Sequence, residues 1–325
     1  MKRILCLYTG GTIGCIPSPE GLAPAPGVLN DHIADLATHF TDAPQVELLE
    51  YPQLLDSSSM GPADWNRIGT DIAERHADYD GFVVLHGTDT LAYTAAALSF
   101  QLENLAKPVI LTGAQHPWFK ADSDAPANVL AALNSALGGW SGVRVAFGGR
   151  LLPGTRVRKS DADRRQAFTA PNWNGQWVGT TATDAPVCCA VIQPEAHFIG
   201  IKLYPGFSCH WLAAALAEPQ QGIVLETYGS GNIPDHANLI TALERQARAG
   251  AIIVNCTQCF SGHVQQGHYA ASNILQRIQA LPAGDMTPEA ALAKLYYLHA
   301  TAATPDEIRA DFVRNLRGEL SPNLC

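Results

Sequence analysis

The sequence has no apolar run that approaches the ~20 residues needed to cross a bilayer. It also has no basic cluster free of acidic residues, and its formal net charge of −9 argues against a nucleic-acid surface. No HExxH pattern occurs among its 11 histidines, which argues against a metalloenzyme. These absences exclude membrane and nucleic-acid partners and leave small molecules as the candidate ligands.

The apolar run behind Met1 is cut short by Gly10 and Gly11, too early for a secretory signal, so we expect a cytoplasmic protein. Its eight cysteines fit that compartment. Cys256 and Cys259 have the spacing of a redox or zinc pair, but neither a second pair nor histidines at ligand spacing accompany them. The sequence therefore predicts no bound metal.

A length of 325 residues with 47% hydrophobic and 16% charged residues suits two globular domains. Strand-like apolar runs alternate with helical patterns, which predicts an α/β fold with a mostly parallel sheet covered by helices. We assign residues 1–176 to a larger N-terminal domain, 177–198 to a linker and 199–325 to a smaller C-terminal α/β domain.

The apolar run Ile4–Tyr8 is typical of a buried parallel strand, and Gly10 and Gly11 follow it closely. Glycines there let a small ligand approach the main chain. Thr12 then lies at the carboxyl end of the strand, where open α/β sheets place their ligand crevice. Its hydroxyl is a candidate nucleophile if another group takes its proton. The alternative is a glycine-rich turn whose threonines bond only their own backbone.

The same plan recurs after the apolar run Gly81–His86, which ends in Gly87, Thr88 and Asp89 directly before a helical pattern. Two such turns from neighbouring strands can face one crevice, where helix N–H groups are available to a carboxylate or an oxyanion. The repetition favours a functional site over an accidental turn.

Further short stretches accompany these two turns along the chain. The full set is Thr9–Gly14, Asp56–Ser58, His86–Thr94, Leu111–Gly113, Lys159, Tyr204–Gly206, Tyr228–Asn232, Thr257–Cys259 and Asn315–Leu320. Together they resemble the bacterial-type L-asparaginases, specifically the cytoplasmic type I enzymes, over nearly the whole chain and in the family's order. Each stretch is weak alone, but the set is highly specific.

The resemblance implies a large N-terminal and a small C-terminal α/β domain, assembled as homodimers or homotetramers. It also implies hydrolysis of L-asparagine to L-aspartate and ammonia without a cofactor. On the family's pattern Thr12 forms a β-aspartyl ester, and water activated by Thr88 hydrolyses it. The implied catalytic residues are Thr12, Thr88, Asp89 and Lys159, and the implied substrate-binding residues are Asp56, Ser57, Ser58, Gly11 and Gly87.

Lys159 can take a proton only in its uncharged form, which burial or a neighbouring cation would favour. Asp89 would oppose that form if it lay close, so we assign Asp89 mainly to the substrate's α-amino group. Backbone N–H groups at the two Gly-Thr turns are the expected oxyanion donors.

The segment from Cys15 to Gly27 is rich in Pro and Gly, which predicts irregular structure and suits a lid over the first turn. In the family this lid carries a tyrosine that touches the nucleophile, but the corresponding position here is Leu22. Either the activation of Thr12 is weakened or another phenol replaces this tyrosine, and our hypothesis for the substitute is Tyr269. Asn232 corresponds to a region that reaches a neighbouring subunit's site in the family.

Two other functions remain open from the sequence. The first is a related amidohydrolase that accepts glutamine or a larger amide, because lid and pocket shape set that specificity. The second is a non-catalytic amino-acid sensor, which the loss of the lid tyrosine at Leu22 makes more credible. Retaining all four implied catalytic residues would be unnecessary for binding alone, so we favour the hydrolase.

If Tyr269 supplies the missing phenol, Tyr269→Phe lowers turnover of asparagine by ~10²-fold, the usual contribution of a proton-transferring side chain. Ammonia release measures this effect. Unchanged turnover would remove Tyr269 from the site.

Overall fold

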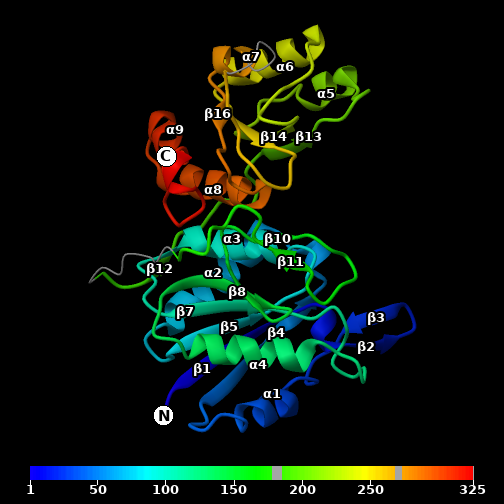
Figure 1. Ribbon diagram of the computed structural model, residues 1–325, viewed down its shortest axis with the longest axis vertical. Helices are drawn as coiled ribbons and strands as arrows, with labels where there is room; N and C mark the ends of the chain where they lie inside the picture. Colours follow the sequence, from blue (N-terminus) through cyan, green and yellow to red (C-terminus); the bar gives the residue numbers. More distant parts are fainter. Residues whose placement is uncertain (178–184, 268–272, 325) are drawn as a thin grey trace. The chain divides into compact units, whose positions relative to one another are not determined.

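The computed structural model describes residues 1–177, 185–267 and 273–324, and the chain divides into two compact units (Figure 1). The first unit comprises Met1–Ala170 and Gln176–Val191, and the second comprises Pro171–Gly175 and Ile192–Cys325. No helix in the described ranges is long and apolar enough to span a membrane.

The first unit is built on a sheet with the strand order β4-β1-β5-β7-β8-β9. The pairings from β4 to β8 are parallel, and β9 joins β8 antiparallel. The strand bounds are β1 Arg3–Gly10, β4 Gln45–Leu55, β5 Gly81–Leu85, β7 Pro108–Thr112, β8 Gly142–Phe147 and β9 Arg150–Pro153. The expected mostly parallel sheet is confirmed.

Helices cover both faces of this sheet: α1 and α4 lie on one face, and α2 and α3 lie on the other (Figure 1). Their bounds are α1 Asn30–Ala37, α2 Pro62–Arg75, α3 Leu91–Gln101 and α4 Ala125–Ala136. Alternate residues of a strand face opposite sides, so Ile4 and Cys6 of β1 join the buried cluster of α1 and α4. Burial on both faces explains why β1, β5 and β7 are continuous apolar runs.

The strand order reverses direction at β1. The chain leaves β1 for β4 on one side, and then returns to place β5 on the other side. Such a reversal opens a crevice at the carboxyl ends of the two strands, which is where α/β folds bind their ligands. The turns after β1 and β5 therefore both lie where this sheet is expected to bind a ligand.

Short antiparallel pairs complete the first unit. They are β2 Cys15–Ser18 with β3 Gly21–Pro24, β6 Leu102–Glu103 with β12 Cys188–Cys189, and β10 Arg158–Lys159 with β11 Phe168–Thr169. The expectation of irregular structure from Cys15 onward was wrong, because β2 and β3 form a hairpin. Pro17 pairs with Leu22 in it. Both strands of a two-stranded ribbon are edges, and an edge accommodates a proline that has no N–H to donate.

The second unit has a parallel sheet in the order β13-β14-β15-β16. Its elements are β13 Phe198–Lys202, α5 Cys209–Ala215, β14 Gly222–Thr227, α6 Ala237–Arg248, β15 Ile252–Thr257, α7 Asn273–Arg277, β16 Leu281–Pro282, α8 Pro288–Thr301 and α9 Pro305–Phe312. Leu212 of α5 and Leu239 and Leu243 of α6 share one buried cluster with Ile223 and Leu225 of β14.

A fully buried ion pair ties the C-terminal segment to α8. Lys294 Nζ lies 2.5 Å from Glu319 Oε1, and both side chains are 0% exposed. The carboxylate of Glu319 also accepts hydrogen bonds from the backbone N–H groups of Leu316 and Arg317. Charges removed from water in this way need such additional partners, and Glu319 has them.

Candidate active site

The turns after β1 and β5 touch through their glycines. Gly11 has a φ of +85°, and a Cβ placed on it would lie 2.4 Å from Gly87 Cα. A side chain at Gly11 would therefore force the two backbones apart. Thr12 and Thr88 directly follow these glycines, so the fold holds both threonine turns at the carboxyl ends of two adjacent strands.

A third turn, which follows β4, packs against the turn after β5. After β4 the chain forms the 3-10 turn Ser57–Ser59, and the Asp56 carboxylate accepts a hydrogen bond from Ser58 N at 2.9 Å. Ser57 Oγ accepts one from Asp89 N at 3.2 Å. A Cβ at Gly87 would lie 2.5 Å from Ser57 Oγ, so Ser57 packs against the Gly87 backbone. The predicted residues Asp56, Ser57 and Ser58 thus adjoin the turn that carries Thr88.

Ser57 is 2% exposed, whereas Asp56 and Ser58 are exposed to solvent. The backbone carbonyl of Ser57 also accepts a hydrogen bond from Thr90 Oγ1 at 2.7 Å. Ser57 therefore fixes the position of the Asp89 turn, and its two neighbours in the sequence are accessible polar residues.

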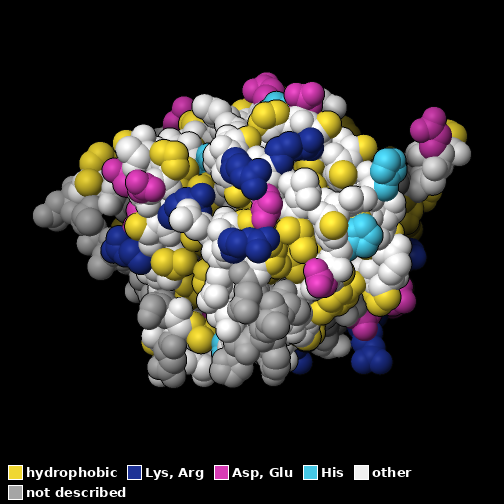
Figure 2. Space-filling model, turned by 90° about the horizontal axis from the view of Figure 1, so that it is seen from above, with side chains coloured by type: hydrophobic (Ala, Val, Ile, Leu, Met, Phe, Trp, Pro, Cys, Tyr) yellow, Lys and Arg dark blue, Asp and Glu magenta, His cyan; other side chains and the backbone are white. Residues whose placement is uncertain are grey.

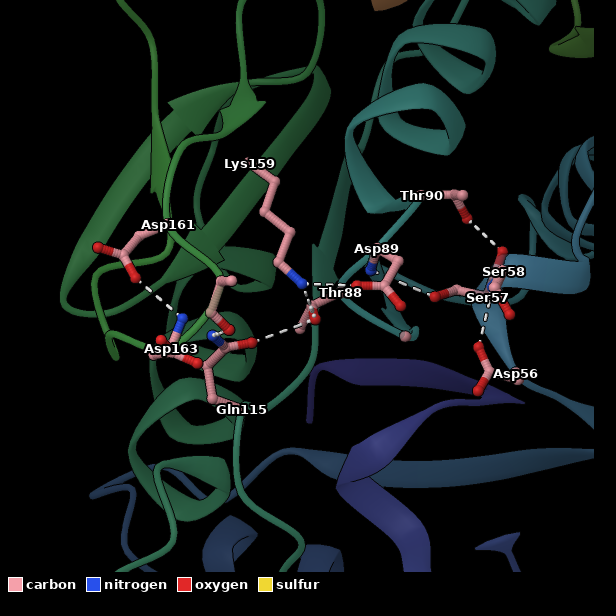
Figure 3. A network of polar contacts seen from close by, with 12 residues as sticks. Asp56, Ser57, Ser58, Thr88, Asp89, Thr90, Gln115, Lys159, Asp161 and Asp163 are labelled. Atoms are coloured by element: carbon pink, nitrogen blue, oxygen red, sulfur yellow. Dashed lines mark hydrogen bonds and ion pairs between the residues drawn. The ribbon is translucent and has the colours of Figure 1, made fainter. Parts of the chain in front are cut away.

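Lys159 of β10 reaches the same turn (Figure 3). Its Nζ donates to Thr88 Oγ1 at 2.8 Å and to Asp89 Oδ1 at 2.7 Å. The Lys159 side chain is 20% exposed, and that of Asp89 is 61% exposed. Asp89, which we assigned mainly to the substrate's α-amino group, thus already forms an ion pair with Lys159 at 2.7 Å.

Gln115 completes this network and was not predicted from the sequence. Thr88 Oγ1 donates to Gln115 Oε1 at 3.2 Å, and Gln115 Nε2 donates to the carbonyl of Ala162 at 2.8 Å (Figure 3). Gln115 follows β7, which neighbours β5 in the sheet. Its position after Gly113, at the end of a third buried strand, was the available signal. With Lys159 donating to the Thr88 oxygen, the Thr88 proton points to Gln115.

Thr12 lies in the 3-10 turn Thr12–Gly14 and is half-buried. No side chain in the described ranges hydrogen-bonds its hydroxyl. Leu22, across the neighbouring hairpin, is 52% exposed and has no polar group to offer. The predicted substitute, Tyr269, lies outside the described residues.

Asn232 lies in the second unit, where its backbone pairs with Tyr228 in a tight turn. Its side-chain oxygen is buried, and none of the described residues donates a hydrogen bond to it. As for metals, the parts of the chain that the structure describes contain no group of three or more His, Cys, Asp or Glu side chains able to hold an ion.

His86 supports the second turn from inside the sheet. It is 0% exposed, its Nδ1 lies 2.7 Å from the Gly87 carbonyl, and its Nε2 lies 2.9 Å from Thr94 Oγ1. The carbonyl can only accept, so Nδ1 carries the proton and Nε2 accepts from Thr94. Burial penalises the charged ring and lowers the pKa of His86 to about 4.

Comparisons with known proteins match asparaginases in both units of the chain. The family model described as "Asparaginase, N-terminal" matches residues 3–183, and the model described as "Glutaminase/Asparaginase C-terminal domain" matches residues 199–312. L-asparaginase 1 of Escherichia coli (strain K12) is 40% identical over 336 residues, which cover 99% of each chain. The chain belongs to the asparaginase family.

Solved structures extend this result to the fold. L-asparaginase I from Vibrio cholerae O1 biovar eltor str. N16961 is 38% identical with a TM-score of 0.87, covering 98% of this chain and 99% of that one. The thermostable L-asparaginase from Thermococcus kodakarensis is 35% identical with a TM-score of 0.86, over 98% and 99% of the two chains. The chain thus has the asparaginase fold that the sequence motifs implied.

In this asparaginase-family chain, the buried His86 makes stability depend on pH. The unfolded state binds more protons than the folded state between the usual pKa of 6.5 and the folded value of about 4. The stabilising contribution is therefore complete above pH 6.5 and is lost as pH falls to about 4, by on the order of 3 kcal/mol. Urea unfolding from pH 7 to pH 4 should show a smaller loss in His86→Asn than in the unmodified chain. Equal losses would contradict this role for His86.

Proposed function

We propose that this chain hydrolyses L-asparagine to L-aspartate and ammonia through an ester on Thr12. The observation that carries the proposal is the backbone contact of the two Gly-Thr turns, with Lys159 hydrogen-bonded to Thr88. The names of the relatives, L-asparaginase in Escherichia coli and Thermococcus kodakarensis, support the same substrate.

In the first half-reaction Thr12 Oγ attacks the carbon of the side-chain amide. The new C–O bond gives a tetrahedral intermediate whose oxyanion is stabilised by backbone N–H groups of the turns at Gly11 and Gly87. The C–N bond then breaks, and the amine leaves as ammonia with the proton given up by the hydroxyl. A threonine hydroxyl is a weak nucleophile at neutral pH, so a base must take that proton during the attack.

The second half-reaction hydrolyses the β-aspartyl ester. A water positioned by Thr88 attacks the ester carbon, and the Thr12–carbon bond breaks as the threonine regains its proton. Gln115 accepts the Thr88 hydrogen bond, so the Thr88 oxygen is oriented by Lys159 on one side and Gln115 on the other. Gln115 is therefore a positioning residue in this proposal.

Asp89 links substrate binding to the ion pair that it forms with Lys159. Its carboxylate is 61% exposed and can therefore receive the α-ammonium of asparagine. That second cation competes for the carboxylate oxygen that Lys159 now holds at 2.7 Å. Bound substrate thus weakens the ion pair between Asp89 and Lys159. Asp56 and Ser58, both exposed, are assigned to the remaining polar groups of the substrate.

The setting of the reaction belongs to the same proposal. We place the chain in the cytoplasm as a homodimer or homotetramer, with asparagine as its small-molecule partner. Among the described cysteines none is paired in a disulfide, which fits a reducing compartment. Asn232 is assigned as an accessory residue of a neighbouring subunit's site, as the family's pattern implies.

Glutamine hydrolysis remains the second candidate function, because the position of the lid tyrosine is occupied by Leu22. Measuring kcat/KM for asparagine and glutamine side by side separates the two. One methylene changes this ratio by only ~10–200-fold, so an asparaginase retains measurable glutaminase activity.

Thr12→Ala removes the nucleophile, and we expect ammonia release from asparagine to fall by ~10³-fold or more. Thr38→Ala is the matched control, since Thr38 is an exposed threonine at the end of α1 whose hydroxyl only donates to the Asp35 carbonyl. Calorimetric titration with aspartate shows whether the Thr12 variant keeps its pocket. An unmodified chain that binds aspartate but releases no ammonia would be the amino-acid sensor instead.

Asp89→Asn removes the charge that receives the substrate's α-ammonium, so we expect KM for asparagine to rise by ~10–100-fold. Succinamate, which is asparagine without its α-amino group, is the discriminating substrate. Its KM should change little between the two proteins. If kcat/KM for both substrates falls equally, Asp89 acts only through Lys159.

A further inference from the structure

A hollow of about 320 Å³ lies on the second unit, where the ends of α6 and α7 approach α9. Its lining residues are Glu244, Ala247, Arg248, Arg277, Ile278, Gln279 and Arg309. These residues are distinct from every group assigned to asparagine hydrolysis, so the hollow has no role in the proposed function.

The charges that line this hollow are unbalanced. Glu244 pairs with Arg277 at 2.7 Å and with Arg248 at 3.1 Å, while Arg309 donates to the Gln279 carbonyl at 2.9 Å. Three guanidinium groups and one carboxylate thus line the hollow, and each guanidinium uses one of its five N–H donors in these contacts. Figure 2 shows dark blue side chains gathered around a magenta one on this face.

Helix ends account for part of this arrangement, but not for all of it. Arg248 and Arg277 end α6 and α7, where a cation stabilises the helix dipole. That effect does not require both to line one hollow together with Arg309. The chain as a whole carries a net charge of −9, so a general excess of basic residues does not explain the cluster either.

We propose that this hollow binds a small phosphorylated molecule carrying two or more negative charges. Guanidinium groups bind phosphate oxygens through paired N–H donors, and three of them in one hollow suit an anion with more than one charge. The volume lies at the lower end of small-molecule pockets, which matches a diphosphate or a short phosphorylated metabolite. The acidic chain disfavours a long polyanion such as nucleic acid.

Isothermal titration with pyrophosphate at constant ionic strength tests the proposal, with orthophosphate and sulfate as weaker-binding comparisons. We expect saturable binding of pyrophosphate that weakens by about tenfold in Arg277→Gln and in Arg309→Gln. Arg314→Gln is the matched control, because Arg314 is also exposed in this unit and also pairs with a carboxylate, Asp311, at 2.7 Å. Its binding should stay within about twofold of the unmodified chain.

Glu244→Gln supplies a test with the opposite sign, since removing the competing carboxylate should tighten pyrophosphate binding by about threefold or more. A general loss of folding would weaken binding instead. Non-saturable binding, equal weakening by Arg314→Gln and Arg277→Gln, or binding of duplex DNA in preference to pyrophosphate would overturn the proposal. Ammonia release from asparagine should be unchanged in each variant, which separates this result from the fate of the proposed function.

Discussion

The backbone contact between Gly11 and Gly87 is the constraint on which the rest of the site depends. It brings the turn after β1 against the turn after β5, and Ser57 packs on the other side of Gly87. Three loops from separate parts of the chain are thereby packed together, with only the small side chain of Ser57 against the Gly87 backbone. The reversal of strand order at β1 provides the crevice, and the absence of Cβ atoms lets the loops approach within it.

Two lysine–carboxylate pairs in this chain show how exposure separates a structural pair from a functional one. Lys294 and Glu319 are both 0% exposed, so no ligand can reach either partner. Asp89 is 61% exposed while Lys159 is mostly covered, so a ligand's cation can reach the carboxylate of that pair. The first pair fastens the C-terminal segment to α8. In the second pair a ligand's cation can compete with Lys159 for the Asp89 carboxylate, and the proposed mechanism uses this property.

The mostly parallel sheet and the two threonine turns at strand ends could be anticipated, because buried strands alternate with helical patterns along the sequence and such folds bind ligands at the carboxyl ends of their strands. The hairpin Cys15–Pro24 could not, since its prolines and glycines mask a short ribbon whose regularity comes from cross-strand pairing. Gln115 was missed for a different reason. A single glutamine after a strand is common, and only its contacts with Thr88 and Ala162 distinguish it.

The sequence by itself determined the family, the α/β class and the residues around which the candidate site is built, because glycines, buried strands and polar turns leave local patterns. Only the tertiary structure decided that Asp89 forms an ion pair with Lys159. It also decided that Ser57 is buried against the Asp89 turn while its neighbours are exposed. Only the tertiary structure brought Arg248, Arg277 and Arg309 to one hollow. The physical reason is that such contacts join residues distant along the chain, and their distances and burial depend on how the loops pack rather than on any local pattern.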